Sequence, residues 1–557
     1  MLALVAGISL MVWNAARSDG LVIESFSVPP EMAAKGFTGQ VIAGKTLDEL
    51  IAIQNANRTS RAAKSFANNW GDDLKVEIPD TGVSVGEAFR FLKSWLGHET
   101  HISGEVTRTQ TGIAITARVS GETGATVSGS EAELDALVHK AAENIYRVTQ
   151  PYRYGVYLQS HGRTAEAIVV FKALATSGPA QERPWGYIGW SNALLDTAPR
   201  EVADALLEKA LTLQPGNILA LNNLATGTLQ AGREEETLAL NSRMLAAMAG
   251  ESSAMIAHDQ LAALSKRPEG VRAQLQGDWQ QAARRIQEGI DLGAASVSSA
   301  SHAVAAQKAW NHDLAGARAV LADPAPSSNV ALGTGVFFAV TTPMMIRFEA
   351  GDWAGVLAGN RALEPVMRQY PGTRSAYRTQ TVALIAQAQA RLGNFAGAET
   401  LIAPTPGDCG PCLRARGWIA HMQGQHARAD FWFARAAAIA PSIPYADAEW
   451  GAALLARGKP DAAIEKFKLA NRKGPHFADP LEGWGEALMA RNQSHLALVK
   501  FAEAEKHAPN WGRLHLKWGE ALLYAGRRDE AMAQFTRARQ LDLTPSEKSE
   551  LGRQGHV

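Results

Sequence analysis

The spacing of hydrophobic and polar residues divides the chain into two parts of different character. Between about residues 21 and 150 the apolar period switches several times between two and 3.6 residues, which is the pattern of mixed strands and helices. It predicts the order β-α-β-α-β-β-β-α. The expected strands are Leu21–Val28, Leu74–Ile78, His101–Thr107, Gly112–Val119 and Ala125–Ser128, and the expected helices are Phe37–Asn55, Val85–Leu96 and Glu131–Val148.

From about residue 148 the strand pattern ends and helix-sized segments recur. A small residue followed four positions later by a bulky apolar one repeats with a period of 34 residues, at Ala463/Phe467, Ala497/Phe501 and Ala531/Phe535. Two more columns keep the same period, namely Trp-Gly at 450–451, 484–485 and 518–519, and proline at 441, 475 and 509. Three independent columns at one period identify a repeat.

These columns resemble the tetratricopeptide repeat, in which small residues lie where two helices touch and an aromatic ring fills the groove between them. The resemblance implies helix pairs stacked into one right-handed solenoid whose first helices line a concave surface. Extending the register backward, with spacings from 31 to 45 residues, gives roughly eleven pairs, the middle ones degenerate. The earlier anchors are Ala429/Phe433, Ala398/Ile402, Val356, Ala317/Leu321, Ala282/Ile286, Thr237, Ala203/Leu207 and Ala167/Phe171.

The amino-terminal part carries a second, shorter resemblance. The run from Ile102 to Arg108, then Ile113 to Val119, ending in Glu122-Thr123-Gly124, resembles the TolB amino-terminal-like domain that precedes tetratricopeptide arrays in many bacterial proteins. That resemblance implies a module without catalytic function. We therefore expect an α+β chain, with a small α/β TolB-N-like module at 21–147, an all-α tetratricopeptide superhelical solenoid at 148–543 and a carboxy-terminal tail at 544–557.

Charge and the first residues bear on the compartment. Lys+Arg and Asp+Glu number 55 each, so the balanced charge gives no electrostatic reason to expect nucleic-acid binding. Leu2–Trp13 is an uncharged apolar run of 12 residues, whereas a membrane-spanning helix needs about 20. Two interpretations stay open for residues 1–20: the outer end of an inner-membrane anchor that begins upstream, or an apolar helix packed on the body. With an anchor and the TolB resemblance we expect a periplasmic location, with the cytoplasm as the alternative.

Two motifs in the α/β module match catalytic patterns. Gly39–Thr46 fits the phosphate-loop pattern G-x-x-x-x-G-K-[ST], but no strand precedes it and its apolar spacing suits a packed amphipathic helix. Gly82-Val83-Ser84-Val85-Gly86 fits the nucleophile-elbow pattern, but Ser84 followed by Glu87 predicts a helix capping box. We favour the structural interpretation of both.

Two further motifs involve cysteine and histidine. Cys409-Gly410-Pro411-Cys412 has the sequence of a thioredoxin-type redox motif, but a Pro-rich loop precedes it and a repeat helix follows, so we expect a structural disulfide or two reduced thiols. His98 and His101 have no third ligand nearby, which argues against a zinc site. We expect no enzymatic activity and no cofactor.

The repeat register also predicts a binding groove for a protein or peptide segment. In a tetratricopeptide repeat the second, fifth, ninth, twelfth and thirteenth positions of the first helix face the concave side. Here they include Arg414, Trp418, His421, Tyr445, Asp479, Glu482, Glu486, Arg513, Glu520 and Tyr524. We expect Trp418 to anchor a partner with little part in stability; the alternative is that these side chains fill a tight superhelix.

The predicted function is a non-enzymatic scaffold that binds partner proteins in this groove. The alternative is a regulatory or sensory protein whose α/β module binds a ligand and whose repeat array recruits partners.

Overall fold

The structure is a computed structural model that describes residues 20–57, 59–68, 98–292, 300–322 and 332–554, together with a few single residues near 9–15, 70 and 92–96. The expected strand 74–78, most of the expected helix 85–96, the Ser84 motif and nearly all of residues 1–20 lie outside the described residues. In the described part of the chain, no helix combines the length and the apolar character needed to cross a membrane. Contacts group the chain into two compact units, Met1–Gly189 and Trp190–Val557.

The first unit is built on a five-stranded sheet in the order β2-β1-β3-β4-β5. Its strands are β1 (Leu21–Ile23), β2 (Phe66–Asn68), β3 (Thr100–Thr109), β4 (Gly112–Val119) and β5 (Glu122–Gly129). β1 pairs in parallel with β2 and β3, with Leu21 opposite Phe66 and Thr100, and the β3-β4-β5 meander is antiparallel. All three residues of β1, which pairs with a strand on each edge, are buried.

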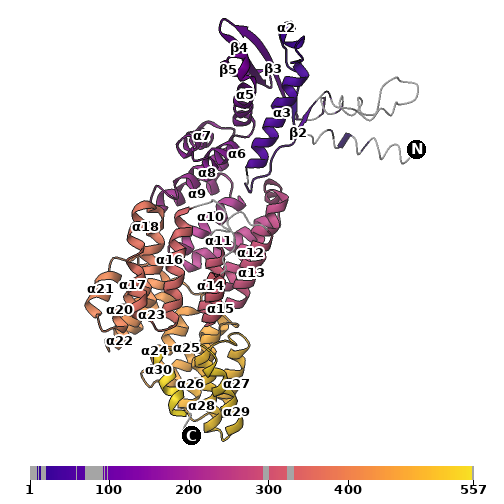
Figure 1. Cartoon of the computed structure of the whole chain (residues 1–557). Helices are drawn as coiled ribbons and strands as arrows, with labels where there is room; N and C mark the ends of the chain where they lie inside the picture. Colours follow the sequence, from indigo (N-terminus) through magenta and orange to yellow (C-terminus); the bar gives the residue numbers. More distant parts are fainter. Residues whose placement is uncertain are drawn as a thin grey trace. The chain divides into compact units, whose positions relative to one another are not determined.

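Helices α3 (Gly39–Ala56) and α5 (Leu134–Thr149) pack against each other, and α5 also covers β4 and β5 (Figure 1). A short helix, α2 (Pro30–Ala33), precedes them. The strands expected at 101–107, 112–119 and 125–128 and the helices expected at 37–55 and 131–148 are present. β2 was not anticipated, since Phe66-Ala67-Asn68 is too short to show a strand period.

The Gly39–Thr46 motif lies entirely within α3. The hydroxyl of Thr38 accepts a hydrogen bond from the backbone N–H of Val41 at 3.3 Å, which makes Thr38 the amino-terminal cap of the helix. Lys45 pairs with Asp135 of α5 at 2.8 Å. A Cβ on Gly39 would lie 1.9 Å from the Phe26 carbonyl oxygen, so this glycine allows a close backbone approach.

The first unit continues into helices α6 (Pro151–Ser160), α7 (Thr164–Ser177) and most of α8 (Arg183–Leu194). The second unit begins with α9 (Arg200–Leu213) and then repeats helical hairpins (Figure 1). The described hairpins are α10 (Ile218–Gln230) with α11 (Glu234–Met248), α12 (His258–Leu275) with α13 (Trp279–Asp291), α14 (Ala300–Trp310) with α15 (Leu314–Ala322), α16 (Leu332–Glu349) with α17 (Trp353–Asn360), α20 (Val382–Arg391) with α21 (Phe395–Ile402), α22 (Gly410–Met422) with α23 (His426–Ile439), α24 (Tyr445–Ala456) with α25 (Pro460–Lys473), α26 (Ala478–Ala490) with α27 (Ser494–Glu505), and α28 (Gly512–Tyr524) with α29 (Arg528–Arg539).

Additional short elements interrupt or end this series. Helix α18 (Leu363–Gln369), α19 (Arg374–Ala376) and a π-helical turn, η5 (Tyr377–Thr381), lie between α17 and α20. Within 544–557, expected as a tail, the structure has helix α30 (Pro545–Gln554), which packs on α28 and buries Leu551. Thr544 and Glu547 form a capping box at its start. α30 therefore covers the end of the solenoid, as repeat arrays require.

The repeat columns form the core of the hairpins. Each small anchor residue, from Ala167 through the degenerate Thr237 and Val356 to Ala531, has no exposed surface. The glycine of each Trp-Gly pair lies against the phenylalanine ring of its own repeat. A Cβ on Gly485 would lie 2.6 Å from Phe501, and the equivalent distances at Gly451 and Gly519 are 2.7 and 2.5 Å. The glycine column therefore reflects close helix packing.

Candidate functional site

The interior of the second unit contains a cavity of about 620 Å³. First helices supply most of its lining, namely α10, α12, α14, α16, α20, α22, α24, α26 and α28, as the tetratricopeptide register predicts. Aromatic side chains and ion pairs share its walls. The ring of Trp279 stacks on Tyr445 with 5.6 Å between centroids and an interplanar angle of 6°, and on Trp310 at 6.2 Å.

The cavity is narrowed because the solenoid is wound tightly enough for early and late hairpins to touch. The turn between α10 and α11 meets α22, where Gly410 N–H donates to the Gly232 carbonyl at 2.9 Å. The last turn of α12 meets the start of α24, where the Tyr445 hydroxyl donates to the Gln274 carbonyl. These contacts join residues more than 170 positions apart. The concave face is therefore a deep, partly enclosed cavity that stays accessible to water.

Residues in left-handed conformation shape the turns at this seam. Gly232 and Gly277 have φ of +73° and +76°. A Cβ on Gly232 would lie 2.9 Å from Cys409 Sγ, and one on Gly277 would lie 2.5 Å from the Phe477 ring. Glycine at these turns thus permits both the backbone conformation and the approach of the opposite hairpin.

The first of three charged clusters in the cavity surrounds Arg414 on α22. Its guanidinium donates to both carboxylate oxygens of Glu234, at 3.1 and 2.8 Å, and its Nε donates to Glu449 at 2.8 Å. Trp418 donates from its indole N–H to the other oxygen of Glu449 at 2.7 Å. Burial raises the pKa of Glu449, and Arg414 and Trp418 oppose that rise.

The second cluster surrounds Arg513 on α28. It pairs with Glu486, with Glu482 at 3.2 Å and with Glu547 at 3.6 Å. Glu482 and Glu486 are one turn apart on α26. Burial, and next to it the negative charge of Glu486, raises the pKa of Glu482 well above its usual value. At Glu486 burial also favours a higher pKa, but burial is outweighed there, chiefly by the positive charge of Arg513, and the pKa is lowered.

The third cluster surrounds His312, in the turn between α14 and α15. Its ring nitrogens lie 3.2 Å from Asp479 and 3.5 Å from Glu349, and the ring stacks on Trp511 at 3.8 Å. Burial lowers the pKa of His312, but the two carboxylates outweigh burial and raise it to about 10. The histidine is therefore an imidazolium at neutral pH.

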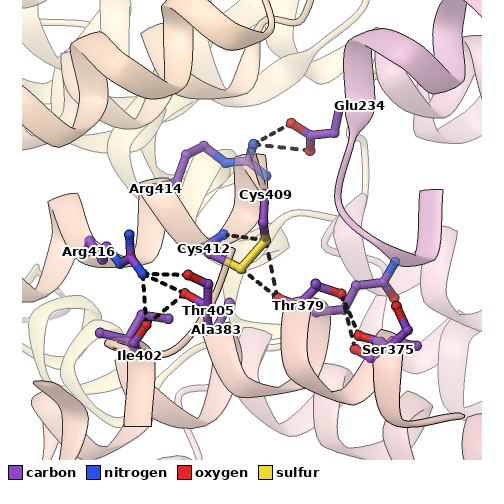
Figure 2. Close-up of a disulfide and its surroundings, with 12 residues drawn as sticks. Glu234, Ser375, Thr379, Ala383, Ile402, Thr405, Cys409, Cys412, Arg414 and Arg416 are labelled. Atoms are coloured by element: carbon purple, nitrogen blue, oxygen red, sulfur yellow. Dashed lines mark hydrogen bonds and ion pairs between the residues drawn. A yellow bond between two sulfur atoms is a disulfide. The ribbon is translucent and has the colours of Figure 1, made fainter. Parts of the chain in front are cut away.

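A disulfide lies at the same seam as the Arg414 cluster (Figure 2). Cys409 and Cys412 are bonded at the start of α22, both fully buried, and Cys409 Sγ accepts the N–H of Cys412 at 3.2 Å. Figure 2 shows Arg414 reaching Glu234 and Arg416 reaching the carbonyls of Ile402 and Thr405. The bond thus fixes the helix start that carries Arg414.

The structure gathers most of the residues named from the repeat register. Arg414, Trp418, Tyr445, Asp479, Glu482, Glu486 and Arg513 line the cavity. Three others do not belong to its lining. His421 lies beside Trp418 and His426, Glu520 pairs with Lys517 at 3.2 Å, and Tyr524 is exposed and donates to Asn492. His98 lies in a loop, and His101 on β3 contacts Glu24 at 3.0 Å.

Trp418 has two roles in this arrangement. It lines the cavity, and its ring also meets the core residue Phe433 edge to face at 6.0 Å. We therefore expect Trp418 to contribute to the stability of its hairpin as well as to line the cavity. Sequence reasoning missed Glu234, Glu349, Glu449 and His312, which reach the cavity from turns or from helix positions outside the assumed register. A histidine where other repeats have glycine was the available signal for His312.

Comparisons with known proteins give partial likenesses. No protein-family model matches the chain. A peroxisomal targeting signal receptor of Yarrowia lipolytica is 32% identical over 97 residues, which is 17% of this chain and only 16% of that protein. Solved structures that match the chain include yeast Tom70 (14% identity, TM-score 0.33, 71% of this chain and 92% of that one) and MamA AMB-1 (21%, 0.23, 30% and 99%). YrrB, described as a TPR protein with an unusual peptide-binding site, is 13% identical with a TM-score of 0.25 over 32% of this chain and 92% of that one.

Proposed function

We propose that the chain is a non-enzymatic scaffold whose tetratricopeptide-type solenoid binds short segments of partner proteins in its interior cavity. One observation carries the proposal: the fifth and ninth register positions of α22, α24 and α26 all line that one cavity. A volume of about 620 Å³ falls within the range of roughly 300–1,000 Å³ typical of ligand sites. The occupant is therefore a few side chains of a segment and not a folded domain.

The lining suits recognition of a segment. Rigid aromatic rings supply a large contact area. Asp479 and Arg513 keep 38% and 33% of their side-chain surface exposed. Polar groups within reach of water therefore lie beside the apolar walls. The short likeness to a targeting-signal receptor is in keeping with this function.

A cavity-filling substitution tests the proposal in the full chain. Ala452 lines the cavity on α24, whereas Ala462 is exposed on α25. Peptides are selected from a random displayed library on the wild-type protein, and their affinities are then measured for Ala452→Trp and Ala462→Trp. We expect at least a tenfold loss, about 1.4 kcal/mol, with Ala452→Trp and none with Ala462→Trp.

Folding of both variants is checked by circular dichroism, and Ala456→Trp, at an exposed position of the lining, serves if Ala452→Trp is unstable. Equal affinity of the selected peptides for wild type and the cavity variants, or no enrichment of any peptide, contradicts the proposal.

A further inference from the structure

The charges of the cavity do not balance. Its lining holds three basic side chains, His312, Arg414 and Arg513, and twice as many carboxylates. The carboxylates are Glu234, Glu349, Glu449, Asp479, Glu482 and Glu486. Each basic group contacts two of them, so one carboxylate per cluster exceeds the positive charge available. Buried negative charge without a counter-charge is strongly unfavourable.

One carboxylate oxygen shows this excess directly. Glu482 is 4% exposed, and its Oε1 accepts no hydrogen bond from the described residues, although Arg513 Nε lies 3.2 Å away. Arg513 is already engaged by Glu486 and faces Glu547 as well, while Lys517 one turn further on α28 pairs with Glu520 and Glu550. Beyond its ion pair with Arg513, Glu482 Oε1 therefore has hydrogen-bonding capacity left for a donor that enters the cavity.

The aromatic walls are of the kind that attract cations. The guanidinium of Arg414 lies 5.1 Å from the Tyr445 ring centre, and that of Arg391 lies 5.7 Å from the Trp418 ring centre. Trp511 already stacks on the imidazolium of His312. Ring faces and carboxylates together stabilise organic cations. The described residues contain no group of three His, Cys, Asp or Glu side chains placed to hold a metal ion.

We propose that the cavity binds an organic cation of the amine or guanidinium class, either a free amine or the basic side chain of a bound segment. The cation is held by the surplus carboxylates, Glu449 and Glu482 foremost, and by the aromatic faces beside them. Binding of a basic side chain, unlike binding of a free amine, rests on the proposed function, because that side chain belongs to the partner segment.

Proton exchange supports the same assignment. Burial raises the pKa of Glu349, of Glu449 and of Glu482, so these carboxyl groups lose their protons less readily than exposed ones. An entering cation favours their ionised form, so binding should release protons to the buffer. Affinity for the cation should therefore increase as pH rises from 5 to 8, because the carboxylates then ionise more easily.

Two probes distinguish the sources of the cation. Spermidine represents a free amine, and a capped hexapeptide of lysine and serine represents a basic segment, with a glutamate–serine hexapeptide as the opposite charge. Binding to the full chain is followed by tryptophan fluorescence, since Trp279, Trp310, Trp418 and Trp511 line the cavity. Calorimetry in two buffers of different ionisation enthalpy measures the protons released.

We expect saturable binding of at least one cationic probe, none of the acidic peptide, and proton release at pH 7. Glu482→Gln and Glu449→Gln should each weaken binding about tenfold, whereas Glu465→Gln, at a side chain 69% exposed on α25, should not change it. Two separate carboxylate variants keep the test valid if one of them unfolds. Saturation by spermidine alone assigns a free amine, and saturation by the peptide alone assigns a segment.

The inference is overturned if neither cationic probe binds, or if the folded carboxylate variants bind like wild type. Its failure can be separated from that of the proposed function. Selected peptides that need the cavity but carry no basic residue would leave the scaffold function standing without the cation site. Spermidine binding without any cavity-dependent peptide would leave the cation site standing without the scaffold function.

Discussion

At the scale of single residues, His312 is the most unusual position of the solenoid. It has φ of +59° at a turn where most other repeats place glycine, and among the described turns within helical hairpins only Asn492 shares that feature. A left-handed conformation costs a side-chain residue about 1–2 kcal/mol. Contacts with Asp479, Glu349 and Trp511 offset this cost, because they connect the α14–α15 turn to helices α16 and α26 and to Trp511 at the start of α28.

His312 predicts a pH dependence of stability. Because its pKa rises from 6.5 unfolded to about 10 folded, its ion pairs with Asp479 and Glu349 stabilise the protein fully below pH 6.5. That stabilisation is lost as pH rises toward 10. We expect His312→Asn, which tolerates positive φ, to lower the free energy of unfolding by about 3 kcal/mol at pH 6. Denaturant unfolding should show the difference from wild type shrinking by pH 10; a constant difference contradicts the assignment.

Trp418 gives a second prediction at this scale. Because its ring packs on Phe433 and its N–H reaches Glu449, Trp418→Ala should lower the free energy of unfolding by about 2 kcal/mol or more. Trp418→Phe keeps the ring and loses only the hydrogen bond, so it should cost less. Thermal unfolding of the two variants compares them, and an unchanged melting temperature for Trp418→Ala would restore a purely partner-binding role.

At the scale of elements, the two helices of a hairpin pack through a phenylalanine ring of the second helix that contacts a glycine of the first. Phe433, Phe467, Phe501 and Phe535 are fully or almost fully buried, and each ring meets the first helix of its own pair at a glycine. A side chain at that glycine would separate the two helices. The Trp-Gly column is therefore a packing requirement that repeats every 34 residues.

A single methyl group tests this packing. Gly485→Ala places a Cβ 2.6 Å from Phe501, so we expect destabilisation by about 1–3 kcal/mol despite the better helix propensity of alanine. Gly552→Ala on α30 is the matched control, since nothing lies within 4 Å of its Cβ, and it should be neutral or stabilising. Chemical unfolding measures both. Partial rescue of Gly485→Ala by Phe501→Leu would identify the ring as the cause, and equal effects at the two glycines would refute it.

At the scale of the second unit, stability depends on contacts between hairpins that are distant in sequence. A repeat protein is usually held by neighbouring repeats alone. Here Arg414 and Glu234 pair across 180 positions, and the disulfide of Cys409 and Cys412 fixes the helix start that carries Arg414. This seam turns a concave surface into a cavity, so it governs access to the site.

Removing Arg414 should open the seam. Arg414→Ala leaves the buried Glu234 and the half-buried Glu449 without a counter-charge, and we expect a loss of about 3–5 kcal/mol. Hydrogen exchange should increase at residues 229–234 and 409–414, and small-angle scattering should show expansion. Arg428→Ala on α23 removes an exposed pair with Glu399 of α21 and should cost under about 1 kcal/mol. Unchanged exchange at the seam in Arg414→Ala would show that other contacts hold it.

Much of this architecture could be predicted from the sequence because its causes are local. The strands β3 to β5, the helices α3 and α5, and the hairpin register each follow from apolar spacing within one or two elements. Anchors as degenerate as Thr237 and Val356 are fully buried as the register requires. The same register placed Arg414, Glu482 and Glu486 on the inner face, because a fixed number of residues per turn sets the face of a helix.

Only the tertiary structure decided what that inner face becomes. The winding of a solenoid is the sum of small rotations between hairpins, and no single repeat encodes whether hairpins many positions apart will touch. The meeting of Gly232 with Gly410, of Tyr445 with Gln274 and of His312 with Asp479 depends on that sum. The sequence therefore determined which side chains face inward, and the tertiary structure determined that they line one cavity with more carboxyl than basic side chains.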